Sequence, residues 1–153
     1  MSSIGYQIRQ AVQGLLVGAA IPGIDTANIK IRMITKATKG IDRLPCIIIS
    51  PYGTLGDKPA DFEGDRDRDY RVRIAIIDAM AGDTETNDDL YSGWIEAALN
   101  AIVVDFDNFA RTTLPTITRN WEVNTESVNE FDDSKMESGL FAFQNLVIRF
   151  SLQ

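Results

Sequence analysis

Residues 68–104 read RDYRVRIAIIDAMAGDTETNDDLYSGWIEAALNAIVV, a strand pattern followed by a helix pattern. In the first part apolar residues alternate with arginines, which predicts a strand with one buried face. The alternation places Tyr70, Val72, Ile74 and Ile76 on one parity and Arg71 and Arg73 on the other. Ile77 makes both faces apolar, so this strand is expected to run into the sheet interior, with its charged beginning at an exposed end or a subunit contact.

The second part of this stretch has apolar residues at helical spacing. One stripe contains Leu90, Trp94, Ala97, Ala98 and Ala101, and Tyr91, Ile95, Leu99 and Ile102 widen it. So broad an apolar stripe predicts a helix that packs on a sheet. Thr86, Asn87 or Asp88 can cap its first turn. Residues 105–114 are expected to form a connector.

Length and composition indicate one domain, residues 1–153, with a single core. The N-terminal sequence MSSIGYQIRQ has no secretory-signal pattern, so synthesis in the cytoplasm is expected. The longest apolar run, GLLVGAAIPGI, is too short for a membrane span. A net charge of −7 has the wrong sign for a general nucleic-acid binder.

The rest of the chain divides into alternating apolar segments and two long acidic loops. The patterns predict a helix over 3–20, strands over 28–34, 44–50, 117–126 and 140–153, and loops over 51–69 and 126–139. A change of parity at Gln144 and Asn145 suggests a β-bulge in the last strand. The role of the two acidic loops is open. This order predicts an α+β fold, a mixed, mainly antiparallel sheet with two helices packed on one face.

Catalytic and metal-binding signatures are scarce. The chain has no histidine, which excludes Ser-His-Asp and Cys-His sites and zinc sites ligated by histidine. Cys46 lies in an apolar run and is interpreted as a buried, inert thiol. The runs from Asp65 and from Asp83 resemble the start of a calcium loop, but neither has the required glycine and terminal glutamate. No cofactor, metal or catalytic residue is therefore predicted, although paired carboxylates of a metal-assisted hydrolase remain an alternative.

The chain resembles the tail terminator and neck proteins of tailed bacteriophages. The resemblance lies in the order of an N-terminal amphipathic helix and the segments LPCIIIS, RVRIAIIDA, NDDLYSGWIEAALNAI and LVIRFSLQ. It implies a virion structural protein, not an enzyme. Such a subunit forms a homo-oligomeric ring, expected to be a hexamer, that caps the tail tube and joins it to the head connector while DNA passes without specific binding. Another neck, head-completion or baseplate component is the alternative within this class.

Two charged strand faces are the candidate subunit interface. Lys30 and Arg32 alternate with apolar residues on one predicted strand, and Glu122 and Glu126 do so on another. A head-to-tail ring joins two different patches, so these opposite charges can set the register between neighbouring subunits.

Overall fold

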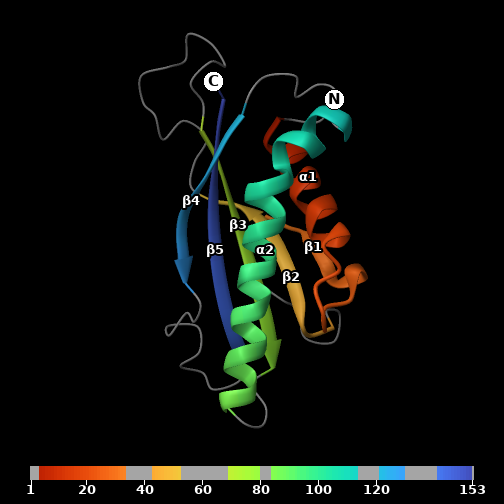
Figure 1. The fold of residues 1–153 in the computed structure, drawn as a ribbon, viewed down its shortest axis with the longest axis vertical. Helices are drawn as coiled ribbons and strands as arrows, with labels where there is room; N and C mark the ends of the chain where they lie inside the picture. Colours follow the sequence, from red (N-terminus) through yellow and green to blue (C-terminus); the bar gives the residue numbers. More distant parts are fainter. Residues whose placement is uncertain are drawn as a thin grey trace.

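The computed structural model describes residues 4–33, 43–52, 69–79, 84–113, 121–129 and 141–152. The elements follow the order α1 (Ile4–Gly18), η1 (Thr26–Asn28), β1 (Ile29–Ile31), β2 (Cys46–Pro51), β3 (Asp69–Ala79), α2 (Thr84–Thr113), β4 (Trp121–Asn129) and β5 (Phe141–Leu152) (Figure 1).

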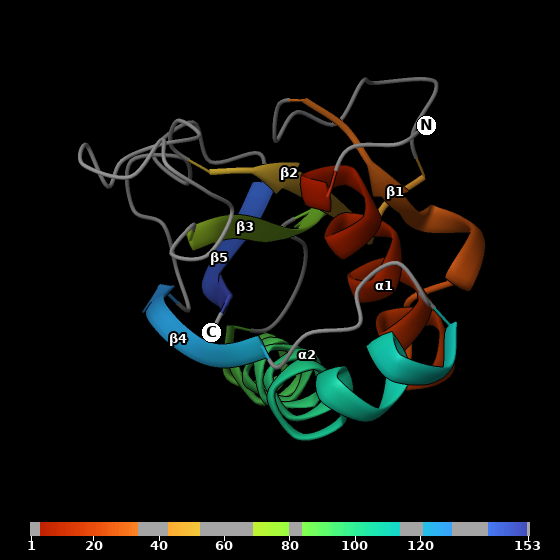
Figure 2. The ribbon, with the colours of Figure 1, turned by 90° about the horizontal axis from the view of Figure 1, so that it is seen from above.

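The described strands form one five-stranded sheet in the order β1-β2-β3-β5-β4. Only β1 and β2 are parallel; the other three pairings are antiparallel. Both helices lie on one side of this sheet, as the view from above shows (Figure 2). The predicted α+β class, with a mixed, mainly antiparallel sheet and two helices on one face, is confirmed.

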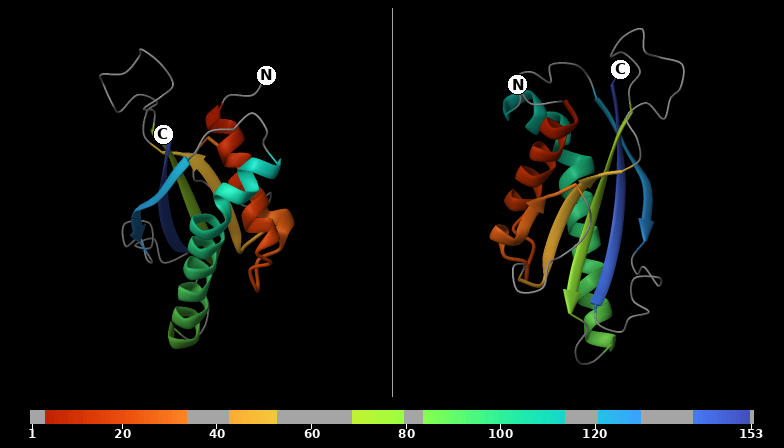
Figure 3. Two further views of the ribbon diagram at one scale, coloured as in Figure 1. Left: turned by 45° about the horizontal axis from the view of Figure 1, so that its top comes forward. Right: turned by 180° about the vertical axis from the view of Figure 1, so that it is seen from behind.

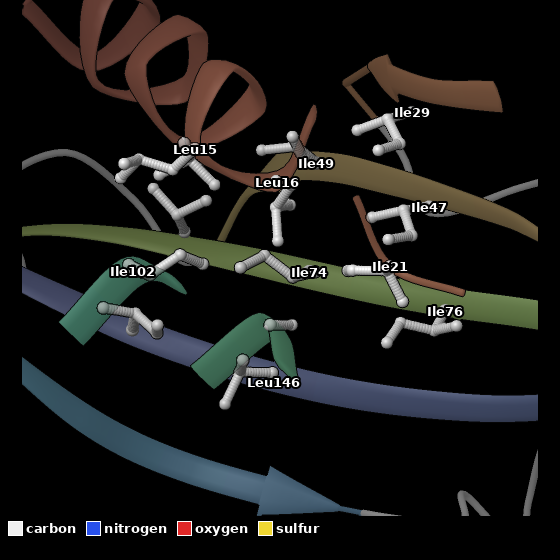
Figure 4. Packing of buried hydrophobic residues seen from close by; sticks show 14 of the residues in the cluster. Leu15, Leu16, Ile21, Ile29, Ile47, Ile49, Ile74, Ile76, Ile102 and Leu146 are labelled. Atoms are coloured by element: carbon white, nitrogen blue, oxygen red, sulfur yellow. The ribbon is translucent and has the colours of Figure 1, made fainter. Parts of the chain in front are cut away.

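The main core lies between the helices and the sheet. Helix α1 packs over β1 and β2, whereas α2 packs over β5 and β4. Leu15 and Leu16 of α1 point toward isoleucines of β2 and β3, and Ile102 of α2 joins the same cluster (Figure 4). The strand residues that face the helices are all buried and include Ile47, Ile49, Val72, Ile74, Ile76, Leu146, Ile148 and Phe150.

The opposite side of the sheet, here called the outer face, has a different composition. Its buried part is a small cluster of Cys46, Ile48, Ala75 and Ile77. Cys46 is thus buried, as predicted. Arg71 and Arg73 continue this face along β3 and lie opposite residues of β5. Figure 3 (right) shows the sheet from behind, with β3 beside β5.

The turn after α1 is fastened to α2 by Trp94. Its Nε1 donates a hydrogen bond to the carbonyl oxygen of Pro22 at 2.7 Å. Gly23 has φ +86°, a conformation that L side chains rarely adopt, and a Cβ there would lie 3.5 Å from the Trp94 ring. The indole ring of Trp94 therefore joins α2 to the turn that follows α1.

A short polar network anchors α2 to the sheet. The Tyr91 hydroxyl donates to Asp78 Oδ2 at 2.9 Å, and Gln144 Nε2 donates to the Tyr91 carbonyl oxygen at 2.8 Å. Burial, with the Asp78 hydrogen bond as a second cause, raises the pKa of Tyr91 to about 12.

This network corrects the predicted bulge in the last strand. Strand β5 pairs with β3 without interruption, and Gln144 occupies a buried position on the same parity as Leu146. A polar residue at this position suggested a change of face, but Gln144 stays on the buried face, and the hydrogen bond of its Nε2 offsets part of the cost of burial. The irregularity lies instead in β4, between Thr125 and Ser127.

Helix α2 differs from the prediction in its length and in the exposure of Leu90. It begins at Thr84 and continues to Thr113, so residues 105–113 are helix and not a connector. No proline or glycine follows Gly93 until Pro115, and the helix has no earlier breaker. Leu90 is 41 % exposed, because the buried stripe is centred on Tyr91, Trp94, Ile95, Ala98 and Ile102.

The two acidic loops are also shorter than predicted, because some of the residues assigned to them belong to strands. Pro51 belongs to β2 and Asp69 begins β3, while residues 126–129 complete β4. Residues 53–68 and 130–140, which contain the remainder of both acidic loops, lie outside the described residues.

Candidate subunit interface

The basic half of the predicted interface lies on the edge strand β1. Lys30 is half-buried and stands opposite Ile48 of the outer face. The Arg32 N–H donates to the Ile49 carbonyl oxygen at 2.9 Å, which continues the pairing of β1 with β2 by one residue. Met33 follows with 78 % of its surface exposed. Methionine and arginine are both enriched at protein interfaces.

The acidic half lies on the other edge strand, β4, where Glu126 occupies the bulge. Its Oε2 is 2.8 Å from Nε of Arg71 in the same chain, with the two side chains 34 % and 24 % exposed. A partly exposed pair of this kind contributes roughly 0–1 kcal/mol. Glu122 belongs to β4 opposite Ser151, but its side chain lies outside the described residues.

The two halves therefore occupy opposite edges of one sheet. Strand β1 pairs only with β2, and β4 only with β5, among the described strands. Figure 1 shows them at the two ends of the sheet. Lys30 and Arg32 are neighbours of each other and distant from Glu126 within a subunit. They can meet it only between subunits.

A cluster of three arginines on the outer face is a feature that the predicted interface did not contain. Arg71 stands directly opposite Arg149, and Arg73 stands opposite Val147 on the same strand pair. We call Arg71, Arg73 and Arg149 the arginine face. The alternation within β3 did indicate a charged surface, but the addition of Arg149 requires the pairing of β3 with β5.

The contacts of these arginines are incomplete in the described part of the chain. The guanidinium carbon of Arg73 lies 4.5 Å from the centroid of the Tyr52 ring, a cation–π geometry. The Nε atoms of Arg73 and Arg149 are buried and have no hydrogen-bond partner among the described residues. A buried donor without a partner is costly to the fold.

The described side chains were compared with the requirements of a metal site. They contain no group of three or more Cys, Asp or Glu residues that could hold a metal ion. The runs that begin at Asp65 and Asp83 lie outside the described residues or have undescribed side chains. Neither described helix combines the length and apolar character that a membrane span requires.

No family model and no curated protein matches this chain. The likeness to tail terminator and neck proteins remains a resemblance in element order and sequence pattern.

Proposed function

We propose that the protein is a structural subunit of a phage virion, a tail terminator that forms a ring, caps the tail tube and joins it to the head connector. The observation that carries the proposal is the placement of a basic patch at the β1 edge and an acidic patch at the β4 edge of one sheet. Two different, complementary patches on opposite edges suit a head-to-tail contact that repeats around a ring.

The two edges are poorly suited to unrestricted strand pairing. Strand β1 has three residues, and β4 is interrupted by a bulge. Short and bulged edges discourage the addition of further strands, which would lead to open-ended assembly. Side-chain contacts therefore define the proposed ring interface, with exposed Met33 on one edge and exposed Val128 on the other adding apolar area.

The net charge of −7 fits the same proposal. A ring through which DNA moves must not retain the polymer, and an acidic subunit repels phosphate. The proposed partners are other copies of the chain, the tail-tube protein and the head connector. The six-fold number is taken from the resemblance alone, as is assembly into the virion after synthesis in the host cytoplasm.

The direct test is a tube-capping assay. Purified protein is added to the tail-tube protein of the same virus during polymerisation, and tube length and tube ends are examined by electron microscopy. We expect tubes to stop growing and to carry a ring of density at one end. Unchanged tube growth and bare ends would reject the proposed function.

A further inference from the structure

Charge is separated between the two layers of the domain. Helix α2 contains six acidic residues and one arginine, a net charge of −5, on the side of the sheet opposite the arginine face. On the arginine face, Glu126 is the acid that the structure pairs with Arg71. One copy of the chain therefore carries both a basic sheet surface and an acidic helix surface.

The outer side of α2 presents a continuous exposed stripe. Asp89, Gly93, Glu96, Asn100 and Val103 follow one another at helical spacing, and all are exposed. A Cβ placed on Gly93 would meet no atom within 4 Å, so the surface between the two carboxylates is open. The stripe therefore contains two acidic residues, a glycine between them and an exposed valine.

The spacing of this stripe matches that of the arginine face. Asp89 and Glu96 are seven residues apart, which corresponds to about 10 Å along a helix. Arg73 and Arg149 are diagonal neighbours on adjacent strands, about 7–8 Å apart at the backbone. Long arginine side chains can span the small difference, and their planar donor groups match the geometry of carboxylates.

We propose that the arginine face of one subunit binds the acidic stripe of α2 on a second copy of this chain. Arg73 and Arg149 donate to the carboxylates of Asp89 and Glu96 through the terminal nitrogens of their guanidinium groups. This contact rests on the proposed ring function and would be a second contact between subunits, in addition to the proposed contact between the β1 and β4 edges. The two surfaces differ, so the contact is head-to-tail.

A carboxylate partner is favoured over a nucleic acid for two reasons. Arg71 already binds the carboxylate of Glu126 at 2.8 Å on this face. In addition, a chain of net charge −7 repels DNA at long range, while the acidic helix of another copy needs to approach only the basic face.

The experiment uses two charge-reversed proteins. One carries Arg73→Glu with Arg149→Glu, and the other carries Asp89→Lys with Glu96→Lys. Self-association is measured by sedimentation velocity, and folding is checked by circular dichroism. We expect the wild-type protein to associate and each variant alone to associate at least ~10-fold more weakly, because like charges then meet. An equimolar mixture should recover association, since every contact between the two variants is complementary again.

A single reversal at exposed Arg43, outside both surfaces, is the matched control and should associate as the wild type does. The inference fails if the mixture does not associate, or if the wild type is monomeric at every concentration. It also fails if the arginine substitutions lower the melting temperature without changing the molar mass, or reduce DNA binding alone. The tube-capping assay is separate: association without capping rejects the proposed function and leaves this contact intact.

Discussion

Arg71 and Arg149 are direct partners on the antiparallel strands β3 and β5, and the carboxylate of Glu126 lies 2.8 Å from Arg71 Nε. Like charges directly opposite each other on a sheet are destabilising. Glu126, which lies at the bulge of β4, offsets this repulsion with its negative charge. The three charged side chains come from three strands, β3, β5 and β4.

Removal of the Glu126 charge should therefore destabilise the sheet. We expect Glu126→Gln to lower the free energy of unfolding by about 0.5–1 kcal/mol, measured by urea denaturation. Glu96→Gln, a change of equal charge on exposed α2, should cost less than about 0.5 kcal/mol. Equal losses in the two variants would show that the effect is general and not due to Arg71.

The orientation of α2 can be tested with two apolar truncations. Ile95→Ala removes a buried side chain and should cost about 2–5 kcal/mol, whereas Leu90→Ala at a partly exposed position should cost less than about 1 kcal/mol. Chemical denaturation of both variants provides the comparison. A larger loss for Leu90→Ala would mean that the helix is rotated from the orientation described above.

Trp94 contributes both packing and a hydrogen bond to Pro22. Trp94→Ala should cost about 3–5 kcal/mol. Trp94→Phe keeps most of the buried ring but loses the Nε1–H donor, and should cost less, on the order of 1–3 kcal/mol. Both values come from denaturant unfolding. A loss under 1 kcal/mol for the alanine variant would contradict the placement of this ring between α2 and the turn at Gly23.

Tyr91 predicts a dependence of stability on alkaline pH. Its pKa is raised from 10.0 to about 12 in the folded protein, so folding favours the protonated hydroxyl. The resulting stabilisation is complete below pH 10 and is lost as the pH rises toward 12. Tyr91→Phe should show a smaller fall in unfolding free energy across this window. Parallel curves for the two proteins would refute the assignment.

Charge reversal at the sheet edge tests the predicted interface. Lys30→Glu with Arg32→Glu should abolish capping in the tail-tube assay, since the reversed patch repels the acidic edge of its neighbour. Glu122→Lys is the compensating change, because Glu126 already binds Arg71 and its reversal would disturb the subunit itself. Capping should return in part. If the first double variant caps tubes normally, the β1 edge is not in the interface.

Local patterns predicted most of the elements and the residues of the core. Alternation in β3 and helical spacing in α1 and α2 identify buried faces, because side-chain direction follows directly from backbone periodicity. Val72, Ile74, Ile76 and Trp94 are on the faces that these patterns predict to be buried, and all four are buried. Patterns failed at Gln144, where a hydrogen bond formed across 53 positions of sequence makes a polar residue acceptable in the core.

The candidate interface was predictable only in part. The bases at Lys30 and Arg32 and the acid at Glu126 were recognisable from alternation with apolar neighbours. The ion pair between Glu126 and Arg71 was not predictable from the sequence. Alternation indicates which face of the sheet a side chain lies on, but not which residue lies beside it on a neighbouring strand.

The sequence by itself determined the α+β class, the number of helices, the apolar faces and the separation of charge along the chain, since each depends on local spacing. The tertiary structure decided the strand order β1-β2-β3-β5-β4, which inserts β5 between β3 and β4. This order places Arg149 opposite Arg71. It also places the strand with Lys30 and Arg32 and the strand with Glu126 at opposite edges of the sheet. Such relationships arise from long-range strand pairing, whose register depends on the burial of one whole face at once.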